Sequence, residues 1–191
     1  NECAAIRIDD QLCKQGKGIT LYSSFKQNLK GDKIYTVFED SEGDEWILTN
    51  KGISIIGKKQ VDSDFPFQYI KEADGIIYLV SQSDKLASYN FKTRQFKFIE
   101  IPYHVSMINE VKKFDSNTLL LATDNGLIIY KIKEKEFQLI DIRTSTQPSN
   151  VVQSVYQDHY KELWIFPQTT GVIRYNPSTK EMQHLFTPAD E

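Results

Sequence analysis

The chain has 191 residues, of which 26% are charged, and a formal net charge of -3 with the two signs interspersed. Because a nucleic-acid-binding surface needs clustered basic residues, this charge pattern argues against nucleic acid as a partner. No apolar run approaches the roughly 20 residues that span a bilayer, and the N-terminal residues lack the order of a signal peptide. We therefore expect contact with a membrane only through a helix outside this sequence.

The N-terminal segment contains both cysteines of the chain, Cys3 and Cys13. They do not form a CxxC pair and have no histidine nearby, so we expect no metal site here. If Asp9 and Asp10 form a hairpin turn, Cys13 lies opposite Ile6 rather than Cys3. A disulfide would then need a bulge or a shift in register, and the redox state of the two thiols stays open.

The segment Glu39–Ile56, EDSEGDEWILTNKGISII, has a pattern that returns later in the chain. An acidic turn containing Gly43 precedes the apolar run that starts at Trp46, and Gly52 then opens another apolar run. The same order returns at residues 157–176 and more faintly at 72–90 and 114–132. A self-similar unit of this size predicts a repeat architecture.

The spacing of the repeats can be measured between the large apolar residue that each repeat has at the same position, here called its anchor. These anchors are Leu12, Trp46, Tyr78, Leu120 and Trp164, separated by 34, 32, 42 and 44 residues. Such spacing suits four-stranded propeller blades as well as several helical repeats. Short runs of β-branched and aromatic residues, without sustained helical periodicity, favour strands and exclude the helical repeats.

Each repeat is expected to contain three inner strands, shown best by the second repeat. There we expect strands at Lys33–Glu39, Glu45–Thr49 and Gly52–Ile56, with apolar residues on both faces. Such strands suit a sheet covered on both sides by neighbouring sheets, as in a β-propeller. Further glycines expected at turns or strand starts are Gly75, Gly126 and Gly171. Their free backbone angles suit these positions.

A fourth, outer strand is expected only in the last three repeats, where polar and apolar residues alternate. The segments are Gln95–Ile101, Glu136–Ile142 and Glu181–Phe186. The first two repeats lack such a segment, and their spacing is shorter by roughly one strand and a turn.

In this pattern the chain resembles the two-component regulator propeller repeat. That repeat has a strand ending near Asp, a glycine turn, Trp-Ile-Gly-Thr, then Asn-Gly-Leu and an aromatic residue. Here the pattern reads FEDSEGDEWILTNKGI from Phe38, and the last repeat matches it at Asp158, at LWIF from Leu163 and at GVIRY from Gly171. The glycine of Trp-Ile-Gly-Thr is replaced by Leu48 and Phe166.

The resemblance implies an all-β fold, a β-propeller of four-stranded antiparallel blades. We expect about five repeats, at residues 2–29, 30–64, 65–102, 103–147 and 148–191, which form a single propeller segment. An incomplete segment of a larger, seven-bladed propeller is our first interpretation, and a complete five-bladed propeller is the alternative.

The resemblance also implies a function. Repeats of this family occur in the periplasmic sensor region of Bacteroides-type hybrid two-component sensor kinases, which are inner-membrane proteins. It implies a non-enzymatic, periplasmic segment that detects glycan-derived oligosaccharides and regulates polysaccharide-utilisation genes, without a cofactor. Its partners would be an oligosaccharide, the rest of the sensor region and a second copy. Two alternatives stay open: a structural or protein-binding scaffold without a sugar site, and a polysaccharide hydrolase or lyase.

Several residues invite a chemical role, but their repetition favours a structural one. We interpret Trp46 and Trp164 as anchors between blades rather than sugar-stacking platforms, because they occupy the same position in two repeats. Asp40 and Asp158 recur in the same way, and no hydrolase or phosphate-binding motif is present, so no catalytic residue is expected. The acidic residues around Gly43 are interpreted as a solvated turn rather than a calcium loop.

If a ligand binds, the expected place is the face that propeller connections share around the axis. The residues expected there are Asn50, Lys51, Tyr103, His104, Asp124, Asn125 and Asn150. This hypothesis depends on position in the fold alone. Of the three histidines, His104 lies in such a connection, whereas His159 lies in a turn and His184 on an outer strand.

Overall fold

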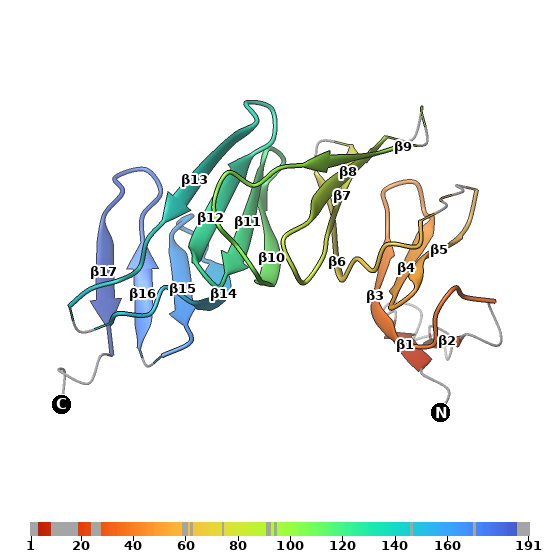
Figure 1. Cartoon of the computed structure of the whole chain (residues 1–191), viewed down its shortest axis with the longest axis horizontal. Coiled ribbons are helices and arrows are strands. Elements are labelled where there is room, and N and C mark those ends of the chain that lie inside the picture. Colours follow the sequence, from red (N-terminus) through yellow and green to blue (C-terminus); the bar gives the residue numbers. More distant parts are fainter. Residues whose placement is uncertain are drawn as a thin grey trace. The chain divides into compact units, whose positions relative to one another are not determined.

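The structure, a computed structural model, describes residues 4–8, 19–23, 28–58, 61, 63–73, 75–90, 93, 95–145, 147–169 and 171–186. Every regular element in these ranges is a β-strand (Figure 1). None of the described residues belongs to a helix long and apolar enough to cross a membrane. Cys3, Cys13 and the expected anchor Leu12 lie outside the described residues, so the prediction for the cysteines is untested.

The described strands form five antiparallel sheets in which consecutive strands are neighbours. The first sheet contains β1 (Ala4–Ile8) and β2 (Ile19–Ser23), and the second contains β3 (Ile34–Glu39), β4 (Glu45–Thr49) and β5 (Gly52–Ile56). The third contains β6 (Tyr69–Ala73), β7 (Ile76–Val80), β8 (Leu86–Asn90) and β9 (Gln95–Ile99). The fourth contains β10 (Ile108–Asp115), β11 (Thr118–Thr123), β12 (Gly126–Lys131) and β13 (Glu136–Ile140). The fifth contains β14 (Val152–Gln157), β15 (Leu163–Pro167), β16 (Val172–Tyr175) and β17 (Met182–Leu185).

These sheets confirm the predicted fold class. Each sheet lies inside one of the five expected repeats, and the inner strands of the second repeat are found within one residue of their expected ends. The outer strand is present as β9, β13 and β17, and the described part of the first two repeats contains none. The irregular repeat length is therefore explained by the outer strand, as the sequence indicates.

The chain divides into two compact units, residues 1–81 with 87–97 and residues 82–86 with 98–191. The first two sheets and most of the third lie in the first unit, and the last two sheets lie in the second. The expected organisation as one propeller segment with the repeat boundaries given above stays a prediction.

Burial differs between the strands of a sheet. All six residues of β11 and the first five of β12 are buried, so both faces of these inner strands are covered. The first strands are different, because β10 and β14 each have only two buried residues. The expectation that all three inner strands are covered on both faces is therefore wrong for the first strand. It lies at one edge of its sheet and has a strand neighbour on one side only.

In each unit the core lies between the face of one sheet and the face of the next. In the first unit, Trp46, Leu48 and Ile53 of the second sheet pack with Ile77 and Leu79 of the third. In the second unit, Leu120, Ala122, Leu127, Ile129 and Ile140 of the fourth sheet pack with Val152, Val155, Leu163, Ile165, Ile173 and Tyr175 of the fifth. Burial of such a side chain contributes about 1.5–3 kcal/mol, which makes these sheet contacts the main source of stability.

A β-bulge recurs near the start of the first strand of three sheets. The register shifts between Ile34 and Thr36 in β3, between Ile108 and Glu110 in β10, and between Val152 and Ser154 in β14. A bulge turns side chains out of the normal alternation of a strand.

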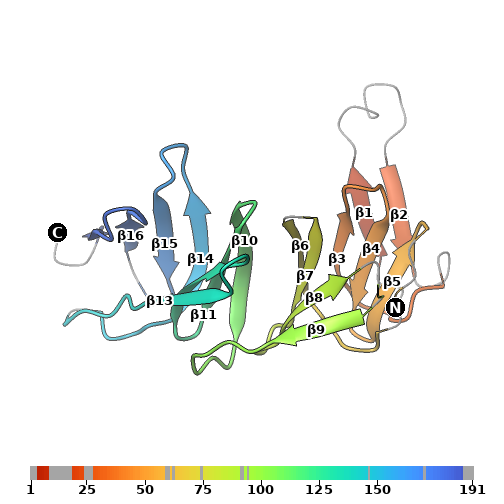
Figure 2. The same cartoon turned by 90° about the horizontal axis from the view of Figure 1, so that it is seen from above.

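Polar side chains at two of these bulges bond to the following sheet. Thr36 Oγ1 donates to the carbonyl oxygen of Gln68 (2.7 Å), which directly precedes β6. Asn109 Nδ2 donates to the carbonyl of Val152 (2.7 Å), and Glu110 Oε2 accepts from the amide of Val155 (3.0 Å). Figure 2 shows β10 beside β14, the two strands that the last pair of bonds connects.

Candidate functional site

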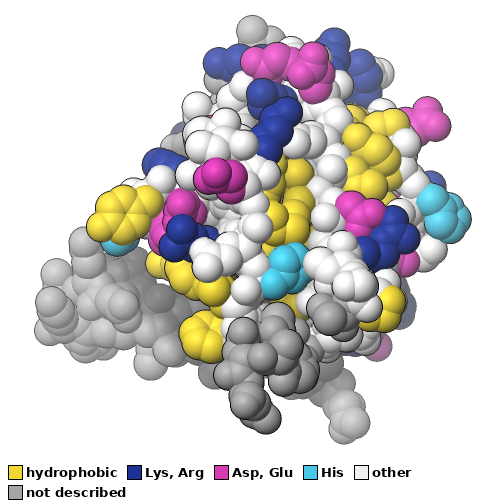
Figure 3. Space-filling model, turned by 90° about the vertical axis from the view of Figure 1, so that its left-hand side faces the viewer, with side chains coloured by type: hydrophobic (Ala, Val, Ile, Leu, Met, Phe, Trp, Pro, Cys, Tyr) yellow, Lys and Arg dark blue, Asp and Glu magenta, His cyan; other side chains and the backbone are white. Residues whose placement is uncertain are grey.

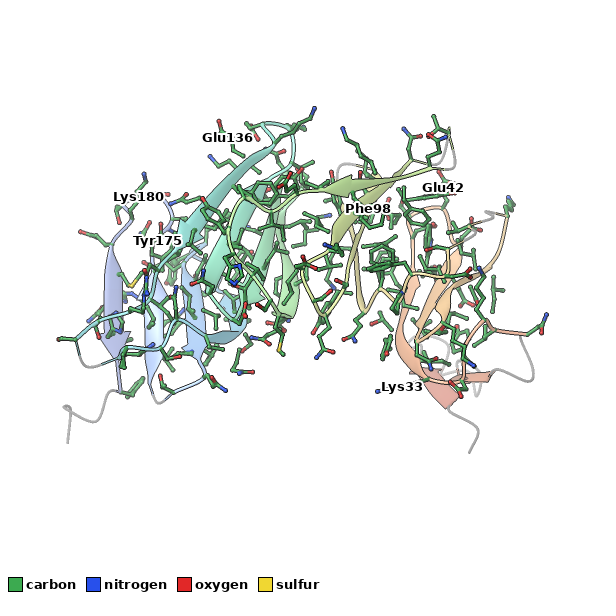
Figure 4. The ribbon with its side chains drawn as sticks, in the orientation of Figure 1. Lys33, Glu42, Phe98, Glu136, Tyr175 and Lys180 are labelled. Carbon is green, nitrogen blue, oxygen red and sulfur yellow. The ribbon has the colours of Figure 1, made fainter. Side chains whose placement is uncertain are left out.

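The turn between β3 and β4 is organised by Asp40. Its Oδ1 accepts hydrogen bonds from the amides of Glu42 (2.9 Å) and Asp44 (3.1 Å), and its Oδ2 accepts from Trp46 Nε1 (2.8 Å). Trp46 is 0% exposed, so its only polar atom is satisfied inside the fold. Figure 4 shows Glu42 at the tip of this turn.

The turn between β14 and β15 has the same arrangement. Asp158 Oδ1 accepts from the amides of Tyr160 (2.9 Å) and Glu162 (3.0 Å), and Oδ2 accepts from Trp164 Nε1 (2.9 Å). The Trp164 N–H holds the pKa of the Asp158 carboxyl below its ordinary value. This shared geometry supports a structural role for both aspartates.

The acidic turn around Gly43 is less solvated than the sequence suggests. Asp40 and Asp44 are 5% and 4% exposed, so the interpretation as a solvated turn is wrong for these two carboxylates. Asp44 Oδ1 accepts from the amide of Lys58 (2.8 Å), which explains its burial. Among the described residues, no three His, Cys, Asp or Glu side chains are grouped to hold a metal ion.

The residues expected at a ligand-binding face are divided between the two units. Asn50 and Lys51 lie in the β4–β5 turn of the first unit. Asn50 Oδ1 accepts from the amide of Lys33 (3.1 Å), and its Nδ2 donates to Asp32 (2.8 Å). The latter bond is the main reason that the pKa of Asp32 is lowered. Asn50 therefore joins its turn to the residues that precede β3.

The other five expected residues lie in the second unit, and three of them form a connected chain. Asn125 Nδ2 donates to the carbonyl of His104 (2.9 Å), and Asn125 Oδ1 accepts from Asn150 Nδ2 (3.1 Å). Asn150 Oδ1 in turn accepts from the amide of Ile142 (2.9 Å). These bonds join the β11–β12 turn to the connections before β10 and after β13. The structure thus brings His104, Asn125 and Asn150 together.

Asp124 and Tyr103 have other neighbours. Asp124 accepts from the amide of Ser106 at 3.0 Å, beside the connected chain. Tyr103 donates through its hydroxyl to the carbonyl of Phe137 on β13 (3.1 Å), so its hydroxyl is directed at the outer strand. The His104 side chain is exposed, whereas its carbonyl makes the structural bond. His104 is thus exposed, whereas Asn125 is half-buried and Asn150 is buried.

Sequence reasoning missed two residues of the connection after β13. Gln147 is 7% exposed, and its Nε2 has no hydrogen-bond partner within the described residues. Arg143 is exposed and pairs with Asp141, and this guanidinium lowers the pKa of the Asp141 carboxyl. Neither residue belongs to the repeat pattern, so the sequence contains no signal for its position.

The first unit has a separate groove of about 800 Å³ that sequence reasoning also missed. It is lined by Glu42, Gly75, Ile76, Ser88, Tyr89, Asn90, Thr93, Gln95, Phe96 and Lys97. The rings of Tyr89 and Phe96 lie 4.9 Å apart and belong to the aromatic cluster around Trp46. None of the seven expected ligand residues lines this groove.

No known family model matches the sequence. Histidine kinase P4 of Formosa agariphila is 22% identical over 156 residues, which is 81% of this chain and 9% of the kinase. The chain therefore spans less than a tenth of the length of this curated relative.

Solved structures with similar folds include an extracellular domain of a two-component system and a lyase. The extracellular domain of a putative hybrid two-component system of Bacteroides thetaiotaomicron has a TM-score of 0.63 and 20% identity, over 82% of this chain and 22% of that chain. Virginiamycin B lyase of Staphylococcus aureus, crystallised as an inactive variant with quinupristin, has a TM-score of 0.65 and 17% identity, over 98% and 74%. The resemblance expected from the sequence is confirmed: this chain has a β-propeller fold similar to that of extracellular domains of hybrid two-component systems.

Proposed function

We propose that this chain is part of the extracytoplasmic sensor region of a hybrid two-component signalling protein. The observation that carries the proposal is the sequence match to a histidine kinase over 81% of the chain, together with the likeness to an extracellular domain of such a system. The chain contributes the binding part of such a protein, and the kinase belongs to other parts of the polypeptide. On this proposal the chain is located in the periplasm and is not an enzyme.

The proposed ligand is an oligosaccharide released during glycan breakdown, bound in the second unit near His104 and Asp124. An exposed imidazole, a half-buried carboxylate and nearby amide groups supply the donors and acceptors that sugar hydroxyls require. Binding alone does not signal. The ligand must have different affinities for two states of the sensor, in which a second copy and the rest of the sensor region take part.

The test is isothermal titration calorimetry of the full extracytoplasmic region against a panel of oligosaccharides from plant, algal and host glycans. For a sugar that binds, His104→Ala is expected to weaken affinity at least tenfold, because the imidazole faces the ligand. The fold should survive, since His104 contributes its backbone carbonyl to the structural bond. His159→Ala is the matched control, because His159 is also exposed but lies in the β14–β15 turn.

Three results would contradict the proposal in different ways. Binding that is unchanged in His104→Ala but lost in Phe96→Ala would move the site to the groove of the first unit. Absence of heat with every sugar would favour a protein-binding scaffold. Product formation from a polysaccharide would favour a lyase or hydrolase, an option kept open by the fold of virginiamycin B lyase.

A further inference from the structure

The β11–β12 turn contains the one Asn-Gly dipeptide of the sequence, Asn125-Gly126. Asparagine is among the chemically labile residues. It is most exposed to attack before glycine, because glycine has no side chain to shield its backbone nitrogen from the side-chain amide of the preceding residue. A potential modification site therefore lies in the turn that joins the two most buried strands of the fourth sheet.

The backbone requires glycine at position 126. Gly126 has φ 100° and pairs with Thr123 across the turn, and a Cβ there would lie 2.6 Å from the carbonyl oxygen of Ile140. The equivalent turn of the second sheet also has a glycine with positive φ, Gly52, but Lys51 precedes it. That turn has the glycine without the reactive amide. The asparagine is therefore the feature that sets the fourth sheet apart.

Both polar atoms of the Asn125 side chain are held by hydrogen bonds. Nδ2 donates to the carbonyl oxygen of His104 (2.9 Å), and Oδ1 accepts from Asn150 Nδ2 (3.1 Å). The backbone nitrogen that would attack is engaged as well, because the N–H of Gly126 donates to the carbonyl oxygen of Asn150 (2.6 Å). A nitrogen in this bond keeps its proton, and the attack requires that proton to leave. The fold therefore holds both reacting groups apart.

We propose that Asn125 is a deamidation site that the folded structure protects, and that its conversion releases the connection before β10. The Gly126 nitrogen forms a bond to Cγ of Asn125, the bond between Cγ and Nδ2 breaks, and the proton of the Gly126 amide leaves with Nδ2 as ammonia. Water then opens the resulting cyclic imide at either carbonyl and gives aspartate or isoaspartate. The reaction involves no oxidant, cofactor or sugar ligand.

The product cannot make the bonds that hold the turn. An ionised carboxylate only accepts hydrogen bonds, so it has no donor for the carbonyl oxygen of His104. Two acceptors then face each other where the β11–β12 turn meets the connection before β10. The new charge also lies next in sequence to Asp124, which is half-buried. The isoaspartate product in addition adds a carbon atom to the backbone of this short turn.

The rate of conversion depends on how often the turn opens. The Gly126 N–H must leave Asn150, and the Asn125 side chain must leave His104, before the two groups can meet. Such local opening costs less free energy than complete unfolding. Conversion is therefore expected in chains that have not yet folded and in folded chains whose second unit opens locally.

The first experiment compares the folded chain with the same chain in guanidinium chloride, both at mildly alkaline pH. Trypsin releases residues 114–131 as one peptide, which contains Asn117 as well as Asn125, so mass spectrometry follows both residues together. We expect Asn125 to convert at least tenfold more slowly in the folded chain. In the unfolded chain it should convert faster than Asn117, because the β-branched Thr118 shields its own backbone nitrogen. Asn150→Ala removes one bond to the side chain and should raise the folded-state rate.

The converted chain can be isolated by its charge. Conversion replaces a neutral amide by a carboxylate, which makes the formal net charge of -3 more negative by one. Acidic and basic side chains lie interspersed on the face that Figure 3 shows, so net charge rather than a patch on that face is expected to govern retention on an anion exchanger. Urea unfolding of the isolated product then measures what the conversion costs in stability.

Asn125→Asp copies the aspartate product and should lower the unfolding midpoint. Asn125→Lys is the matched control, because Lys51 occupies this position in the second sheet and an ammonium group can donate to the carbonyl of His104. Its midpoint should lie above that of Asn125→Asp. Equal conversion rates of Asn125 in the folded and unfolded chain would overturn the protection. An unchanged midpoint in Asn125→Asp would overturn the release of the connection, and neither result depends on the folding of Asn150→Ala.

Discussion

Asp40 and Asp158 each connect a turn to a tryptophan through three hydrogen bonds. One carboxylate oxygen fixes the turn amides, and the other satisfies the indole N–H. For the buried Asp40, hydrogen bonds to a charged group contribute about 1.5–3 kcal/mol each, more than bonds between neutral groups. The two aspartates therefore stabilise their sheets.

Replacing Asp40 by alanine is expected to lower the free energy of unfolding by about 2–4 kcal/mol, because it leaves a buried indole N–H and two turn amides without their acceptor. Urea unfolding monitored by circular dichroism measures this loss. In a Trp46→Phe background the same substitution should cost less, because the indole donor is already absent. An equal cost in both backgrounds would show that the Asp40–Trp46 bond contributes nothing.

The pH dependence of stability follows from the lowered pKa of Asp158. An unperturbed aspartate titrates at about 3.9. Because the folded-state pKa is lower, the carboxylate contributes stability that is complete above this pH and is lost as the pH falls through the folded-state pKa. Urea unfolding of the Trp46→Phe protein, followed by Trp164 emission from about pH 5 to about pH 2, should show this loss.

The control for this pH effect is Asp158→Asn, which keeps most of the shape of the side chain but cannot ionise. Its stability should change less over the same pH range. If both proteins lost stability with the same slope, the Asp158 carboxylate would not be the group that titrates.

At the scale of single residues, the sequence predicts the positions of the anchor residues better than the hydrogen bonds between each aspartate and its tryptophan. Trp46 is buried between sheets, as its repetition indicates, and Trp164 is half-buried. Each aspartate lies six residues before its tryptophan in both repeats, a signal that was present in the sequence. What the sequence could not supply is the direction of the carboxylate, which depends on the backbone of the turn.

At the scale of elements, the turns of equivalent strands tolerate different residues. Gly43 has φ 84°, and Lys161 has φ 67° at the equivalent position of the fifth sheet. A Cβ on Gly43 would meet nothing within 4 Å, whereas a Cβ on Gly126 would lie 2.6 Å from the carbonyl oxygen of Ile140. The first position therefore needs only an unusual backbone angle, and the second also needs space.

This difference predicts a graded result for two glycine substitutions. Gly43→Ala should cost about 1 kcal/mol, the strain of a left-handed residue that carries a side chain. Gly126→Ala should cost at least twice as much, because β12 must also move away from β13. Chemical denaturation of the two variants in parallel measures both values. Equal losses would show that the contact with Ile140 is relieved without cost.

The strands could be predicted because the same pattern of apolar and turn residues recurs in each repeat. Runs such as TLLLAT are buried on both faces and cannot form a half-solvated sheet. The first strands were misjudged, because IYTVF is as apolar as an inner strand although β3 has only partly buried and exposed residues. Its place at the sheet edge is a property of the assembled sheet and not of the local sequence.

At the scale of the whole molecule, ligand binding is expected to stabilise the fold. A sugar that binds only the folded extracytoplasmic region at 100 times its Kd should raise the free energy of unfolding by about 2.7 kcal/mol. Thermal unfolding of that region with increasing sugar concentration measures the shift. With the tenfold weaker affinity expected for His104→Ala, the gain should fall to about 1.4 kcal/mol at the same sugar concentration, and an unchanged gain would place the ligand elsewhere.

The fold was predictable from the sequence to a greater extent than the site. Residues that recur in every repeat make the contacts that every sheet shares. Their recurrence therefore predicts the sheets and the anchor residues. A ligand site would depend on residues that differ between repeats. Their connections have no common pattern, and five of the seven expected residues proved to lie in one unit while Asn50 and Lys51 lie in the other.

The link between aspartate and tryptophan also has a consequence for the speed and order of folding. Asp40 and Trp46 are separated by six residues, and the β3–β4 turn closes between them. Contacts so close in sequence cost little chain entropy, and hairpins form in about 1–10 μs. We therefore expect each repeat with this pair to contain its own early folding nucleus. Sheets can then be added to it in either direction along the chain, as in other repeat proteins.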